Sequence, residues 1–140
     1  MNRSIKKVAV LGSGVMGSRI ACHFANIGCE VLLLDIVPKE TNPIETAKGL
    51  TLESKVVRNR IVNDALAFAL KSNPSPIYKK EFAARISTGN FTDDMAKIAN
   101  VDWVIEVVVE NLDIKKKVYE HVEKFRKQGA LITSNTSGIS

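Results

Sequence analysis

The sequence predicts an α/β domain built on a doubly wound parallel sheet. Short apolar runs alternate along the chain with segments whose apolar residues recur at helical spacing, a pattern typical of a parallel sheet covered by helices. The first run, Val8 to Leu11, leads into Gly12-Ser13-Gly14-Val15-Met16-Gly17, and the second, Val31 to Leu34, ends on Asp35. In sheets that bind dinucleotides, glycines at this spacing let a pyrophosphate reach a helix N-terminus, and the acid accepts hydrogen bonds from the adenosine ribose. We therefore expect a Rossmann sheet.

The first half of the chain follows this pattern closely. Residues 5 to 11 predict the first strand, and Val15 to Ile27 predict a helix that ends at Gly28. Glu30 to Asp35 predict the second strand, which is almost wholly apolar, as a central parallel strand covered on both faces should be.

A long segment separates Asp35 from the third strand, where a minimal Rossmann unit has a single helix. Asn42-Pro43 with Glu45 forms a good helix start, and Asn73-Pro74-Ser75-Pro76 ends the helical pattern. We expect an elongated helix or a helical hairpin in this insertion. Its basic residues fit a solvated helix face: Lys48, Lys55, Arg58 and Arg60.

The second half predicts three more strands. Ile86 to Thr88, Asp102 to Val109 and Ala130 to Ser134 read as strands three, four and five. Between them lie a short helix over Met95 to Ala99 and a longer one from Leu112 to Gly129. With right-handed crossovers, the expected strand order is 3-2-1-4-5.

That order predicts one ligand crevice where the strand order reverses. Open α/β sheets bind ligands at the carboxyl ends of the strands at this switch point. The glycine loop, Val108 to Glu110, and Asn135 to Ser137 should converge there. Glu106 lies inside a strand predicted to be buried, so it requires a polar partner.

Composition excludes several classes of protein. The chain has 140 residues, 45% of them hydrophobic, which suffices for one domain with a real core. No apolar run approaches the roughly 20 residues that cross a bilayer, so we expect a cytoplasmic protein without membrane insertion. The net charge of +5 is scattered without interleaved aromatics, which argues against nucleic acid. Cys22, Cys29, His23 and His121 lack metal-ligand spacing, and we expect no metal.

Three motifs together resemble one enzyme family. They are Gly12-x-Gly14-x-Met16-Gly17, then Val107-Val108-Val109-Glu110-Asn111-Leu112 with Lys115, and Ser134-Asn135-Thr136-Ser137. The chain resembles, over essentially all of its length, the NAD-binding half of the L-3-hydroxyacyl-CoA dehydrogenases. The insertion, with Pro74-Ser75-Pro76 and Ser87-Thr88-Gly89-Asn90-Phe91, is most similar to the long members fused to an enoyl-CoA hydratase.

The resemblance implies a reaction and a larger parent protein. Family members oxidise 3-hydroxyacyl-CoA to 3-ketoacyl-CoA in fatty-acid β-oxidation, with NAD as the hydride acceptor. The family's base is a histidine held by a glutamate, and both lie beyond the segment that ends at Ser137. A helical domain that completes the acyl-CoA cleft would also follow. We therefore expect residues 1 to 140 to be the NAD-binding part of a longer enzyme, and inactive alone.

Individual residues receive expected roles. Asp35 should take two ribose hydroxyls and repel a 2′-phosphate, which favours NAD over NADP. The resemblance implies that Glu110 and Lys115 line the cofactor near its nicotinamide end, and that Ser137 contacts both the cofactor and the substrate hydroxyl. Ser137 would orient the substrate, because no adjacent base activates it for attack. The other expected cofactor contacts are Gly12, Gly14, Val15, Met16, Gly17, Val108 and Val109.

Gly138 stands where many family members carry a second serine, which loosens the loop around Ser137.

Two other functions remain as alternatives. One is a non-catalytic NAD(H)-sensing regulatory domain, such as that of a potassium transporter or channel, and the other is the NAD domain of another 3-hydroxyacid dehydrogenase. Apolar surface left without its partner domain also predicts self-association, in the simplest case a homodimer.

Overall fold

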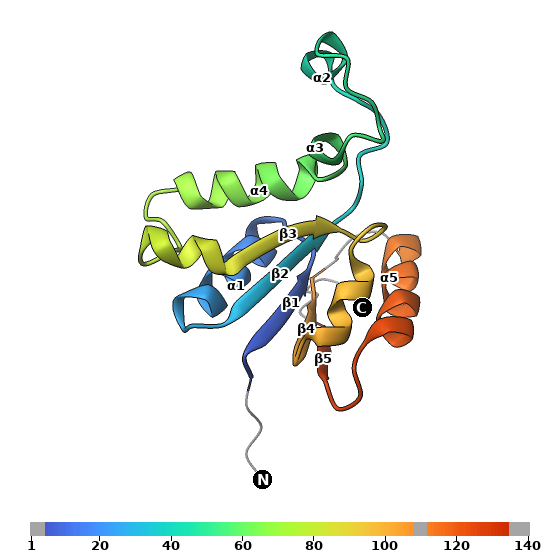
Figure 1. Cartoon of the computed structure of the whole chain (residues 1–140). Helices are drawn as coiled ribbons and strands as arrows, with labels where there is room; N and C mark the ends of the chain where they lie inside the picture. Colours follow the sequence, from blue (N-terminus) through green and yellow to red (C-terminus); the bar gives the residue numbers. More distant parts are fainter. Residues whose placement is uncertain (1–4, 108–111, 135–140) are drawn as a thin grey trace.

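The fold is a five-stranded parallel sheet between two layers of helices (Figure 1). The computed structural model describes residues 5–107 and 112–134. The strands are β1 (Lys7–Leu11), β2 (Glu30–Asp35), β3 (Ile86–Asn90), β4 (Trp103–Glu106) and β5 (Leu131–Ser134). Their order is β3-β2-β1-β4-β5, with every pair parallel, which confirms the predicted topology.

Alternate residues of the central strands supply the two halves of the core. On one face, Val8, Val10, Val31 and Leu33 pack with residues of α1 (Val15–Asn26) and α4 (Arg60–Lys71). The other face joins Ala9, Leu11, Leu34 and Val104 to α5 (Leu112–Phe125) and the 3₁₀ helix η2 (Met95–Asn100). This alternation explains why β1 and β2 are apolar on both faces, because each side of the sheet is covered.

The insertion after β2 is helical but broken into three pieces. They are α2 (Pro43–Ala47), α3 (Lys55–Arg58) and α4, and Figure 1 shows α2 at the end of an arm that projects from the sheet. The start at Asn42 is confirmed: Asn42 Oδ1 accepts from the Glu45 N–H, and Glu45 Oε1 accepts from the Asn42 N–H, both at 2.8 Å. The prediction of an elongated helix or a helical hairpin is not confirmed, because the segment divides into three helices: Gly49 turns the chain at φ 76° after α2, and Asn59 separates α3 from α4.

Long-range polar contacts decide the shape of this insertion. Asn59, which separates α3 from α4, is buried, and its Oδ1 accepts from Asn90 Nδ2 at 2.7 Å. Arg58 donates to both carboxylate oxygens of Asp93, and Arg60 forms an ion pair with Glu45. The expectation of a wholly solvated basic face is therefore wrong for these two arginines, which tie the insertion together and to the end of β3.

Smaller differences lie at the ends of elements. The strand predicted over residues 102 to 109 is observed over Trp103–Glu106, and the Val107 N–H donates to the Leu11 carbonyl; residues 108 and 109 lie outside the described part of the chain. The helix predicted at Met95 is a 3₁₀ helix, and another 3₁₀ helix, η1 (Lys80–Arg85), was not predicted. Among the helices that the structure describes, none is long and apolar enough to cross a membrane.

Candidate cofactor site

The glycine loop joins β1 to α1 and leaves space beside the helix N-terminus. A Cβ at Gly17 would lie 1.8 Å from the Gly12 carbonyl oxygen, so this position admits only hydrogen. A Cβ at Gly14 would have no described atom within 4 Å. Gly14 is also the N-cap of α1, where no described side chain caps the first turn. The loop therefore combines an open approach with the positive end of a helix, which is the arrangement that binds a phosphate group.

Asp35 lies beside this loop at the carboxyl end of β2. Its Oδ2 accepts hydrogen bonds from the Ser13 N–H at 2.8 Å and from the Ser13 hydroxyl at 2.5 Å, and its Oδ1 accepts from the Ile36 N–H at 2.7 Å. A carboxylate offers about four acceptor positions, so these bonds orient the group and leave capacity for a ligand hydroxyl. The structure thus brings together the two motifs that the sequence places far apart.

A small pocket opens directly after Asp35. It has a volume of about 260 Å³, and apolar side chains form most of its wall: Ile36, Val37, Phe91 and Val118. Lys39, Lys117 and His121 also line it. No pattern in the sequence predicts this pocket, because its walls come from three segments that are remote from one another in the chain. The one local indication of the pocket in the sequence is the apolar pair Ile36-Val37 directly after Asp35.

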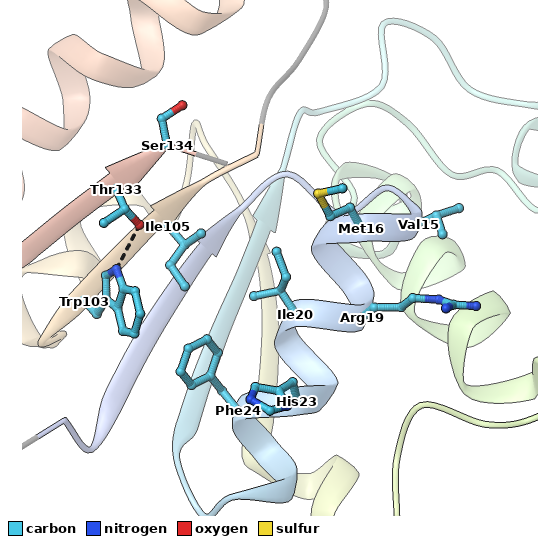
Figure 2. Close-up of a pocket in the computed structure, with 10 residues that line it drawn as sticks. All are labelled: Val15, Met16, Arg19, Ile20, His23, Phe24, Trp103, Ile105, Thr133 and Ser134. Carbon is cyan, nitrogen blue, oxygen red and sulfur yellow. Dashed lines mark hydrogen bonds between the residues drawn. The ribbon is translucent and has the colours of Figure 1, made fainter. Parts of the chain in front are cut away.

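A larger apolar groove lies between α1 and the strands β4 and β5 (Figure 2). Its volume is about 770 Å³. Figure 2 shows Val15 and Met16 at one end, near the start of α1, and Phe24 and Trp103 at the other. Val15 is 68% exposed and Met16 46% exposed, so the first turn of the helix presents apolar surface to this groove.

Glu106 and Ser134 are the last residues of β4 and β5, and they lie opposite each other in the register of the two strands. Glu106 is 1% exposed, and its Oε2 accepts a hydrogen bond from the Ser134 hydroxyl at 2.7 Å. The predicted need of Glu106 for a polar partner is therefore confirmed. Lys115 lies in the first turns of α5, with its Nζ 5.9 Å from the Tyr119 ring.

Several predicted site residues lie outside the described part of the chain. They are Val108, Val109, Glu110 and Ser137. The predicted convergence of their two segments with the glycine loop stays a prediction, although β1, β4 and β5 do end side by side. Ser13 is a site residue that sequence reasoning missed. The sequence feature that could have indicated it is a serine between Gly12 and Gly14, in the loop that lies next to Asp35, because a hydroxyl there can donate to that carboxylate.

Comparison with known proteins decides the family. Residues 7–140 match a sequence model described as "3-hydroxyacyl-CoA dehydrogenase, NAD binding domain". The chain belongs to this family. A probable 3-hydroxyacyl-CoA dehydrogenase of Bacillus subtilis is 51% identical over 140 residues, which are 100% of this chain and 18% of that protein. The fatty acid oxidation complex subunit alpha of Pseudomonas putida is 36% identical over 138 residues, which are 97% of this chain and 17% of that protein.

Solved structures of 3-hydroxyacyl-CoA dehydrogenases share the fold. The (S)-3-hydroxybutyryl-CoA dehydrogenase of Ralstonia eutropha matches with a TM-score of 0.60 at 27% identity, over 98% of this chain and 43% of that chain. All of these proteins are much longer than the part that matches. This chain spans 18% of the Bacillus subtilis protein, 17% of the Pseudomonas putida protein and 43% of the Ralstonia eutropha chain. The cofactor of this family domain is NAD, as the glycine loop and Asp35 predict.

Proposed function

We propose that this chain holds NAD for a longer enzyme that oxidises 3-hydroxyacyl-CoA to 3-ketoacyl-CoA in fatty-acid β-oxidation. The observation that carries the proposal is that the Ser13 hydrogen bonds hold Asp35 beside the glycine loop, whose Gly14 leaves an open approach to the first turn of α1. Relatives named as a 3-hydroxyacyl-CoA dehydrogenase and as a fatty acid oxidation complex subunit support the substrate class.

The described residues divide the work of holding the dinucleotide. The α1 N-terminus at Gly14 would hold the pyrophosphate, and Asp35 would accept from the adenosine ribose. The pocket of about 260 Å³ behind Ile36 is large and apolar enough for the adenine ring. The other half of the cofactor would then pass over the ends of β4 and β5, where Lys115, Glu110 and Ser137 are proposed to lie near it.

Bound NAD would accept the hydride from C3 of the hydroxyacyl group, while the hydroxyl proton passes to a base, giving the ketone and NADH. Ser137 would orient that hydroxyl. His23 lies in the last turn of α1, and His121 lies well along α5, so neither is placed to serve as the base. We propose that the base and the rest of the acyl-CoA cleft come from other parts of the parent enzyme. The cytoplasmic location and the homodimer stay predictions.

Titration with NADH, followed by its fluorescence, tests the proposal. Asp35→Ala should raise the Kd for NADH by about 10- to 100-fold, because a charge-assisted pair of hydrogen bonds is lost. Asp64→Ala removes the same charge from the exposed side of α4 and should leave the Kd unchanged. NADPH should bind the unaltered chain at least about tenfold more weakly than NADH, since Asp35 repels its 2′-phosphate.

Two results would refute the proposal. One is the absence of NADH binding by the unaltered chain, and the other is an equal Kd for the Asp35→Ala and Asp64→Ala variants. Thermal unfolding of each variant shows that it is folded. The chain alone should not oxidise 3-hydroxybutyryl-CoA, and robust turnover would contradict the assignment of the base to another part of the parent.

A further inference from the structure

Glu106 is a buried acid at the point where three strands end. It is the last residue of β4, its register partners are Leu11 on β1 and Ser134 on β5, and it is 1% exposed. The Ser134 hydroxyl donates to Glu106 Oε2 at 2.7 Å. Burial of a carboxylate is costly, and open α/β sheets bind ligands at the carboxyl ends of their strands, so an acid buried at this position calls for an explanation beyond packing.

The strand order places Glu106 under one particular half of the cofactor. Asp35 ends β2, on one side of β1, and Glu106 ends β4, on the other side. With the ribose of adenosine at Asp35 and the pyrophosphate at Gly14 between them, the nicotinamide half must extend over β4 and β5. This step rests on the proposed function.

The two redox forms of the cofactor differ in charge at this end. The nicotinamide ring is cationic in NAD⁺ and neutral in NADH, while the adenosine and pyrophosphate groups are the same in both. We propose that the Glu106 carboxylate strengthens the binding of NAD⁺ relative to NADH. Because Glu106 is buried at the end of β4, bulk water screens the field of its carboxylate less than it screens a surface charge.

A purely structural role for Glu106 makes a different prediction. If the carboxylate only ties β4 to β5 through Ser134, its loss weakens both redox forms equally. If its charge acts on the ring, its loss weakens NAD⁺ selectively. The ratio of the two dissociation constants therefore separates the two roles, whereas either constant alone does not.

The decisive variant is Glu106→Gln, which keeps the shape of the side chain and an oxygen that accepts from Ser134. Calorimetry with NAD⁺ and fluorescence titration with NADH give the ratio Kd(NAD⁺)/Kd(NADH) for each protein. We expect Glu106→Gln to raise this ratio about fivefold, the scale of one charge acting across a partly buried path. Ser134→Ala removes the hydrogen bond but keeps the carboxylate, and should leave the ratio within about twofold.

Asp102→Asn is the matched control for charge. Asp102 immediately precedes β4, so this variant replaces a carboxylate by an amide at the opposite end of the same strand, about 13 Å from Glu106. Its ratio should equal that of the unaltered chain.

An unchanged ratio in Glu106→Gln, or an equal rise in Ser134→Ala or Asp102→Asn, would overturn the inference while leaving the proposed function intact. A Glu106→Gln variant too unstable to assay is replaced by Glu106→Met, which also removes the charge at a similar side-chain length and should raise the ratio about fivefold; an unchanged ratio there would also overturn the inference. Absence of binding of both forms to the unaltered chain would overturn the inference and the proposed function together.

Discussion

Two alanine substitutions in the glycine loop should separate folding from cofactor binding. In Gly17→Ala, the new methyl carbon would lie 1.8 Å from the Gly12 carbonyl oxygen and 2.7 Å from its carbon. Both distances fall more than about 0.5 Å short of ordinary contact, and the opposing atoms belong to the backbone. The loop or α1 has to shift, and we expect a loss of about 3 kcal/mol in the free energy of unfolding.

Gly14→Ala provides the matched comparison. Gly14 has a φ of −58°, which any residue adopts, and its added methyl would meet no described atom within 4 Å. Its free energy of unfolding should change by less than about 0.5 kcal/mol. The methyl would, however, occupy the space proposed for the pyrophosphate, so the Kd for NADH should rise at least about tenfold.

Urea unfolding followed by the fluorescence of the single tryptophan, Trp103, measures the first effect, and NADH titration measures the second. A Gly17→Ala variant as stable as the unaltered chain would refute the close approach of Gly17 to Gly12. A Gly14→Ala variant that binds NADH normally would refute the placement of the pyrophosphate.

Two further predictions concern stability and thiol reactivity. The pKa of Asp102 is lowered from 3.8 to about 2 by hydrogen bonds from the Lys127 ammonium and from the N–H groups of residues 6 and 7. The ionised carboxylate therefore stabilises the fold above pH 4, and this stabilisation is lost as the pH falls towards 2. Asp102→Asn should therefore cost about 1 kcal/mol at pH 7 and flatten the pH dependence of urea unfolding in that window; an unchanged slope would contradict this. Burial raises the pKa of both Cys22 and Cys29, so a thiol reagent at pH 8 should react far faster in urea than with the folded chain, and equal rates would contradict their burial.

Local patterns in the sequence were sufficient to predict the five strands and their order. Alternating apolar runs and helical stripes predicted all five strands, and the handedness of crossovers then predicted the order β3-β2-β1-β4-β5. The capping residues Asn42 and Glu45 act within one turn of helix, so their bonds could be predicted from spacing alone. The same reasoning placed Asp35 at the edge of the sheet where β1 runs into the glycine loop.

Only the tertiary structure decided the contacts that join remote segments. The break at Asn59 depends on Asn90, the orientation of Asp35 depends on Ser13, and Glu106 meets Ser134 only because β4 and β5 pair in one register. Periodicity and capping depend on neighbours within a few residues, and the sequence therefore determined the strands, the helix starts at Val15 and Pro43, and the cofactor motif. Hydrogen bonds between side chains depend on distances of a few ångströms across the fold, and these are set only when the sheet and its helices have packed.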